Sequence, residues 1–95
     1  MNLQQLRAFC AVADQLSFTL AARNLHYAQS SVTAQIQRLE ESLGVQLFDR
    51  SARQIVLTEA GRTLLPFAAH IIRTVETAHA QLAAVKVRTP ARGAA

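Results

Sequence analysis

The sequence predicts a mainly α-helical fold, and three observations support this prediction. Apolar residues recur every three or four positions along four segments, which is the repeat of helices that each bury one face. Hydrophobic residues make up 51% of the chain but aromatic residues only 5%, a balance typical of helices packed through Leu, Ile, Val and Ala. A chain of 95 residues suffices for one modest core and is too short for a core plus a separate catalytic domain.

Two short helices are expected at the beginning of the chain. The first should run from Asn2, its N-cap, to about Ala13. The second should begin after Ser17, whose hydroxyl is a suitable N-cap, and end near Asn24. The residues expected to face the core are Leu3, Leu6, Phe9 or Cys10, and Ala13 in the first helix, and Leu20, Ala21 and Leu25 in the second.

A third, longer helix is expected between Ala28 and Gly44. Its apolar stripe is narrow and consists of Val32, Ile36, Leu39 and Leu43. Gln29 lies in the first turn, and the opposite face carries Ser30, Thr33, Ala34 and Gln37. Within this segment no acidic residue precedes Glu40, so this face can lie against DNA, where amide and hydroxyl groups hydrogen-bond base edges. An ordinary solvated face has the same composition.

Only His26, Tyr27 and Ala28 separate the second and third helices. This gap is as short as the turn of a helix-turn-helix, and small residues at 21 and 22 would let the two helices cross closely. The pair is therefore either a DNA-binding unit whose second helix enters the major groove or a helical corner of the kind found in any helical domain.

Two short β-prone runs, 47–50 and 54–57, predict a hairpin after the third helix. Leu47, Ile55 and Leu57 are expected to cover the helices while Arg50 and Arg53 point outward near the tip. Such a hairpin is typical of a DNA-contacting wing. The alternative is a solvated loop in which Arg50 pairs with Asp49 or Glu40.

A long final helix is expected to begin after the N-cap Thr58 and to continue to about residue 88. Its apolar stripe is too long for the preceding residues to cover, and Leu65, Ala68 and Ile72 widen it, so we expect homodimerisation through this helix. Pro66 should bend the helix or loosen its first turns. The stripe consists of Ala60, Leu64, Phe67, Ile71, Val75, Ala78, Leu82 and Val85.

Charge and composition limit the function classes. A net charge of +4 and a pI near 10.7 favour nucleic acid or another anionic partner. The single Cys10 excludes an internal disulfide and a cysteine-rich zinc site, and no carboxylate or second histidine follows any of the three histidines at i+3 or i+4. The sequence contains no phosphate-binding loop or catalytic set, which predicts a non-enzymatic protein without a cofactor in this fragment. The absence of a signal peptide or membrane span predicts a cytoplasmic protein.

Residues 1 to about 88 resemble the N-terminal winged helix-turn-helix and linker helix of LysR-type bacterial transcriptional regulators. Five motifs in one order carry the resemblance, and together they favour the DNA-binding interpretation of the turn, the third helix and the wing. The motifs are Leu3-x-x-Leu6-Arg7-x-Phe9, Ser17-Phe18-Thr19-x-Ala21-Ala22, Gln29-x-x-Val32-Thr33-x-Gln35-Ile36-x-x-Leu39-Glu40-x-x-Leu43-Gly44, Leu47-Phe48-x-Arg50 and Leu57-Thr58-x-Ala60-Gly61.

The resemblance implies a role for specific side chains. By this resemblance, Gln29, Ser30 and Thr33 contact DNA from the recognition helix. Thr19 contacts the phosphates, and Arg53 contacts DNA from the wing. Gln37 and Arg50 join this set of candidate DNA-binding residues from their expected positions alone. Two positions depart from the family pattern. Ala28 lacks the usual Ser or Thr hydroxyl, so we expect an N-cap and a phosphate contact to be missing there, and Ala34 offers only a methyl group where relatives often have a longer polar or basic side chain.

The expected organisation is a DNA-binding domain at 1–58, a dimerisation helix at 59–88 and a flexible tail at 89–95. Family members continue into a C-terminal domain that binds a small-molecule effector, so we expect this chain to be a fragment of such a regulator. The expected function is sequence-specific binding of promoter DNA, as a homodimer on an inverted repeat. A helical protein-interaction module that dimerises without binding DNA is the alternative.

Overall fold

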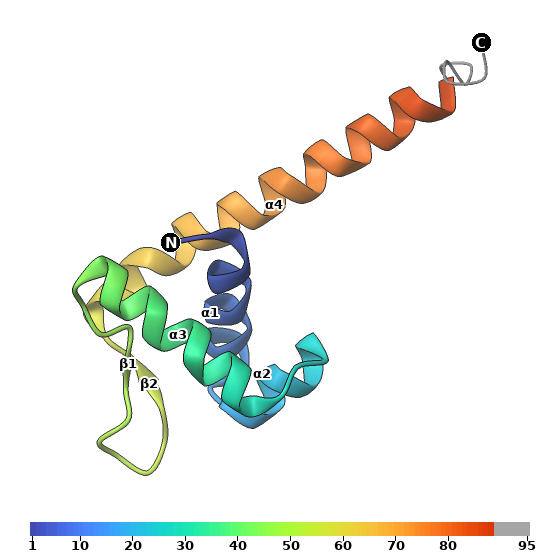
Figure 1. Cartoon of the computed structure of the whole chain (residues 1–95). Helices are drawn as coiled ribbons and strands as arrows, with labels where there is room; N and C mark the ends of the chain where they lie inside the picture. Colours follow the sequence, from blue (N-terminus) through green and yellow to red (C-terminus); the bar gives the residue numbers. More distant parts are fainter. Residues whose placement is uncertain (89–95) are drawn as a thin grey trace.

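The computed structural model describes residues 1–88, so the predicted tail at 89–95 lies outside the described residues. Four helices and one antiparallel hairpin form the fold (Figure 1), which confirms the predicted mainly helical class. The elements in chain order are α1 (Leu3–Gln15), α2 (Phe18–Leu25), α3 (Gln29–Leu43), β1 (Phe48–Asp49), β2 (Val56–Leu57) and α4 (Glu59–Arg88).

Helix α1 begins with a capping box that confirms Asn2 as its N-cap. The Asn2 side-chain oxygen accepts a hydrogen bond from the N–H of Gln5 at 2.8 Å, and the Gln5 side-chain oxygen accepts one from the N–H of Asn2 at 3.2 Å. The helix continues past the expected end to Gln15. Of the two alternatives for the third inward position, Phe9 is fully buried, whereas Cys10 is half-buried and burial raises the pKa of its thiol.

Helix α2 begins at the predicted cap, because the Ser17 hydroxyl accepts a hydrogen bond from the N–H of Leu20 at 3.1 Å. It ends one residue later than expected, since the left-handed residue is His26, with a φ of 59°. The prediction that Leu20 faces the core is wrong, since 41% of this residue is exposed. A helix of eight residues buries only one side, and Phe18, Ala21 and Ala22 occupy that side.

Helix α3 buries its predicted stripe, since Val32, Ile36 and Leu39 are fully buried, although Leu43 at its end is 37% exposed. It follows α2 after three residues, and the N–H of Tyr27 donates to the carbonyl of Ala22 at 2.9 Å, which closes the C-terminal end of α2. The predicted helix-turn-helix is therefore present. Gly44 ends α3 in the left-handed conformation, with a φ of 72°.

The hairpin covers one side of the core and contacts both α1 and α2 through Phe48. Phe48 pairs with Leu57 in the antiparallel ladder, and the Phe48 ring packs against the rings of Phe9 and Phe18 at centroid distances of 5.5 and 6.0 Å. Leu47 is buried as predicted. Phe48 is also buried, although the sequence analysis did not place it in the core.

Helix α4 begins at the predicted cap, because the Thr58 hydroxyl accepts a hydrogen bond from the N–H of Gly61 at 3.1 Å. Gly61 lies so close to the hairpin that a β-carbon there would overlap the carbonyl oxygen of Leu47 and lie 2.7 Å from a Leu57 methyl group. The residue at this position must therefore be glycine, because any side chain would prevent this close approach of α4 to the hairpin.

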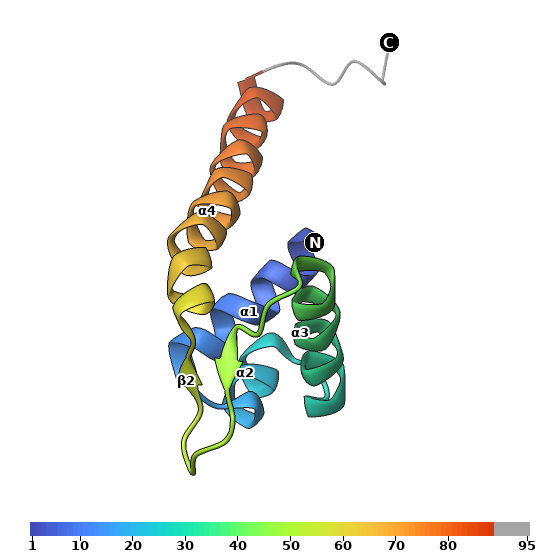
Figure 2. The same cartoon turned by 90° about the vertical axis from the view of Figure 1, so that its left-hand side faces the viewer.

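The first half of α4 packs against α1, and the second half extends away from the other helices (Figure 2), which gives the molecule extents of 60 × 26 × 20 Å. The helix is continuous through Pro66. Ala68 is fully buried, and Leu65 and Ile72 pack against the core of the same chain. The prediction that these three residues widen a dimer face is therefore wrong for Ala68, whereas Leu65 and Ile72 are only partly buried.

Candidate nucleic-acid interface

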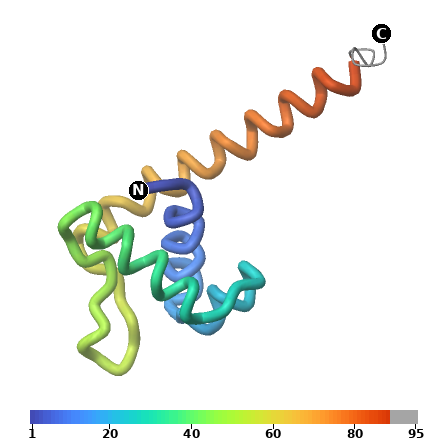
Figure 3. Tube along the Cα trace, viewed as in Figure 1, coloured from blue at the N-terminus to red at the C-terminus, as the bar shows by residue number. Residues whose placement is uncertain are grey.

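The N-terminal turn of α3 and the loop of the hairpin lie at the same end of the molecule. Figures 1 and 2 agree on this arrangement, and the trace in Figure 3 shows both segments opposite the distal end of α4. Gln29 and Ser30 are exposed in the first turn of α3, and Arg53 is exposed in the hairpin loop. The structure thus brings predicted DNA-binding residues from two separate segments to one end.

Along α3, the remaining candidates follow one another at successive turns. Thr33 is half-buried and Gln37 is exposed, so both offer polar atoms to solvent. From Gln29 to Gln37 the helix rises about 12 Å, which is comparable to the width of the major groove of B-form DNA. Arg38 is an exposed cation on the same helix that the predicted set did not include.

The start of α3 offers hydrogen-bond donors to an anion. Ala28 occupies the N-cap position with a φ of −69° and a ψ of 147°, and its side chain makes no capping hydrogen bond. The first turn contains no acidic residue. Free N–H groups and the positive end of the helix dipole attract phosphate at such a terminus. The departure at Ala28 therefore leaves backbone donors available that a serine or threonine would occupy.

Thr19 lies beside the first turn of α3. Its hydroxyl donates a hydrogen bond to the side-chain oxygen of Gln29 at 3.0 Å, and both residues are exposed. The sequence analysis selected both residues but did not predict this contact. No local pattern indicates it, because the two positions come together only through the crossing of α2 and α3.

Arg50 is exposed, and its side chain also contacts other parts of the chain. Its guanidinium lies 3.6 Å from a carboxylate oxygen of Glu40 and 4.7 Å from the centre of the Phe18 ring. This is the Arg50–Glu40 pairing of the solvated-loop alternative. Asp49 bonds instead to the backbone N–H and hydroxyl of Ser51, and these hydrogen bonds lower the pKa of its carboxyl group. Arg53, in the hairpin loop, is also exposed.

Glu40 links the hairpin to the C-terminal part of α3 through hydrogen bonds. Its second carboxylate oxygen accepts hydrogen bonds from the N–H groups of Leu47 at 2.8 Å and Phe48 at 3.4 Å. The same side chain thus binds both the backbone and the Arg50 side chain of the wing. The sequence analysis missed this role, since a glutamate on a helix does not reveal a partner seven or eight residues away.

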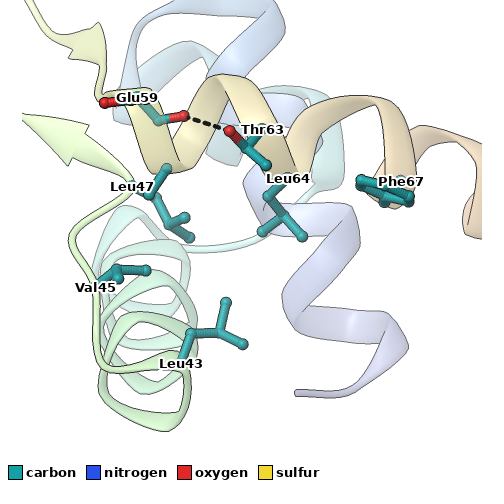
Figure 4. Close-up of a pocket in the computed structure, with 8 residues that line it drawn as sticks. Leu43, Val45, Leu47, Glu59, Thr63, Leu64 and Phe67 are labelled. Carbon is teal, nitrogen blue, oxygen red and sulfur yellow. Dashed lines mark hydrogen bonds between the residues drawn. The ribbon is translucent and has the colours of Figure 1, made fainter.

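An apolar surface continues along the outer side of α4. A groove with a volume of about 530 Å³ lies between the end of α3 and the first turns of α4 (Figure 4). Phe67, at its rim, is 65% exposed. Further along the helix, Ile71 is 38%, Leu82 67% and Val85 44% exposed, and Ala78 is also exposed, whereas Leu64 and Val75 are half-buried. The side chains that line the groove are Leu43, Val45, Leu47, Glu59, Ala60, Thr63, Leu64 and Phe67.

Within residues 1–88, no cluster of three or more His, Cys, Asp or Glu side chains could hold a metal ion. In the same part of the chain, none of the helices combines the length and the apolar character that crossing a membrane requires.

The family model described as "Bacterial regulatory helix-turn-helix protein, lysR family" matches residues 3–62. The uncharacterised HTH-type transcriptional regulator YwqM of Bacillus subtilis is 49% identical over 78 residues, which cover 82% of this chain and 27% of that protein. The HTH-type transcriptional regulator ClcR of Pseudomonas putida is 42% identical over 93 residues, which cover 98% of this chain and 30% of that protein. The chain thus spans less than a third of the length of either relative.

Solved structures give the same result. The BenM_DBD protein in its complex with catB site 1 DNA is 36% identical and superimposes with a TM-score of 0.86, covering 90% of this chain and 97% of that chain. The CbnR_DBD protein in its DNA complex is 38% identical, with a TM-score of 0.82, covering 90% of this chain and 99% of that chain. Together with the motifs and the winged helix-turn-helix geometry, these matches establish that the chain belongs to the lysR family of bacterial regulatory helix-turn-helix proteins.

Proposed function

We propose that this chain binds double-stranded DNA in a sequence-specific manner and forms the DNA-binding part of a bacterial transcriptional regulator. One observation carries the proposal: the exposed, acid-free first turn of α3 lies at the same end of the molecule as the exposed Arg53 of the wing. A helix of this kind fits the major groove, while the wing reaches the neighbouring backbone or minor groove.

The residues divide into two roles. Gln29, Ser30, Thr33 and Gln37 offer amide and hydroxyl groups that would face base edges and nearby phosphates from α3. Arg53 would neutralise a phosphate or enter a narrow A·T minor groove. Arg50 is assigned a structural role in place of direct contact, because Glu40 and Phe18 hold its guanidinium.

The apolar surface of α4 supports a homodimer as the binding form. In a monomer, Phe67, Ile71 and Leu82 would expose their side chains to water, and a two-fold axis would bury the same surface on both copies. The predicted partner surface consists of Leu64, Phe67, Ile71, Val75, Ala78 and Leu82. Two copies of α3 held in this way would bind the two halves of an inverted repeat in successive major grooves.

This proposal assigns residues 1–58 to DNA binding and residues 59–88 to dimerisation. The relatives are named transcriptional regulators, which supports a non-enzymatic role without a cofactor in this part of the protein. A small-molecule effector would act through a further domain of the whole regulator. With bacterial DNA as its partner, the protein would act in the cytoplasm.

The dependence of affinity on salt tests the proposal most simply. A duplex selected by the protein from a random library is labelled, and binding is followed by fluorescence anisotropy as the salt concentration rises. For a DNA-binding protein, the logarithm of the binding constant should fall linearly with the logarithm of the salt concentration, because counterions are released from the contacted phosphates. Arg53→Ala should flatten the slope by about one if Arg53 contacts one phosphate. Failure to select any duplex would favour the dimerising interaction module.

A further inference from the structure

The hydrogen bond between Thr19 and Gln29 is the feature that extends the proposed function. It joins α2 to the first turn of α3 through two exposed side chains, with the Thr19 hydroxyl as donor and the Gln29 side-chain oxygen as acceptor at 3.0 Å. Thr19 is itself held by α2, whose N-cap Ser17 and buried Phe18 fix the beginning of that helix. The bond therefore restricts the orientation of the Gln29 amide before any DNA is bound.

This orientation determines which end of the amide is free. A glutamine side chain carries one acceptor oxygen and an NH₂ group with two donors, on opposite sides of the same carbon. With its oxygen turned towards Thr19, Gln29 offers its NH₂ group to the outside. The pairing of glutamine with adenine needs both ends of the amide at once, whereas guanine O6 and N7, or thymine O4, need only donors.

We propose that Thr19 is a specificity-determining positioning residue, which holds Gln29 as a hydrogen-bond donor and thereby directs it to the keto oxygen of guanine or thymine in the major groove. The inference rests on the proposed function of α3 as the base-reading helix. It also changes the role of Thr19, because the hydroxyl proton that bonds to Gln29 is unavailable to the phosphate contact that the family resemblance implied.

The first step of the test locates the base pair that Gln29 contacts. Each base pair of one half-site in the selected duplex is replaced in turn, and affinities are measured for the unmodified protein and for Gln29→Ala. The contacted position is the one at which the variant no longer distinguishes the four base pairs. If no position behaves in this way, the proposed base-reading function of α3 fails, and this result is distinct from a failure of the Thr19 inference.

The second step changes single groups of that base pair. In one duplex, sulfur replaces the keto oxygen, through 6-thioguanine or 4-thiothymine. In a second duplex, the opposite base lacks its exocyclic amino group, because 2-pyrimidinone replaces cytosine or purine replaces adenine. Loss of one good hydrogen bond corresponds to about a fivefold change in affinity. The unmodified protein should lose about that much on sulfur substitution and change less than about twofold on amino-group removal. The reverse pattern would overturn the inference.

The third step removes the hydroxyl of Thr19. Thr19→Val keeps the shape of the side chain, and Thr19→Ser keeps the hydroxyl as a matched control. The affinity of the valine variant should change equally with the two base modifications, while its salt slope and thermal unfolding temperature stay unchanged. The serine variant should behave like the unmodified protein. A valine variant that retains the preference for the keto oxygen, or that weakens binding to all duplexes and flattens the salt slope, would contradict a positioning role.

Discussion

Removal of the Glu40 side chain should loosen the wing and destabilise the domain. The carboxylate, whose side chain is only 15% exposed, accepts hydrogen bonds from two backbone N–H groups, those of Leu47 at 2.8 Å and Phe48 at 3.4 Å. A hydrogen bond to a charged group stabilises a fold by about 1.5–3 kcal/mol, and the longer bond contributes less. The ion pair with Arg50, whose side chain is 37% exposed, adds at most about 1 kcal/mol. Glu40→Ala should therefore lower the free energy of unfolding by about 2–4 kcal/mol.

Urea denaturation at equal protein concentration measures this effect, since dimerisation makes stability depend on concentration. Glu41→Ala is the matched control: it removes the same charge from the adjacent, exposed position and should change the free energy of unfolding by less than about 0.5 kcal/mol. Glu40→Gln keeps an acceptor for the Leu47 N–H and should fall between the two. If Glu40→Ala and Glu41→Ala are equally mild, the attachment of the wing through Glu40 is wrong.

Three further substitutions test the packing, the cap and the dimer. Gly61→Ala should destabilise the fold by about 2 kcal/mol or more, because its β-carbon would overlap the Leu47 carbonyl; an unchanged thermal unfolding temperature would contradict this contact. Ala28→Ser should stabilise the fold by about 1 kcal/mol through an N-cap hydrogen bond, and an unchanged urea midpoint would show that this helix end gains nothing from a capping hydroxyl. Ile71→Asp should give a folded monomer in sedimentation that binds the full inverted repeat little better than a half-site; a variant that stays dimeric would refute the role of α4.

The helices and their caps could be predicted from the sequence because their causes are local. Asn2, Ser17 and Thr58 each act within three residues of their partners, and the helical spacing of Val32 and Ile36 identifies the buried side of α3. Local reasoning failed where neighbouring side chains compete for one buried face. Leu20 is apolar but lies away from the side of α2 that packs on the core.

The contacts between elements could not be predicted in this way. For Arg50, the sequence offered both an outward position and a pairing with Asp49 or Glu40, and it could not decide between them because Glu40 and Phe18 come from α3 and α2. The bond between Thr19 and Gln29 has the same origin. For α4, the apolar pattern indicated that one broad face is buried, yet it could not separate Ala68, which packs within the chain, from Phe67, which remains exposed.

The central claim is that the first turn of α3 reads bases, and the affinity of Gln29→Ala for two duplexes tests it most directly. The selected duplex and a random duplex of equal length are titrated at one salt concentration, so that the phosphate contribution is the same for both. The variant should lose about 1–3 kcal/mol of binding free energy on the selected duplex and almost none on the random duplex. An unchanged ratio of the two affinities would show that α3 does not read the sequence through Gln29.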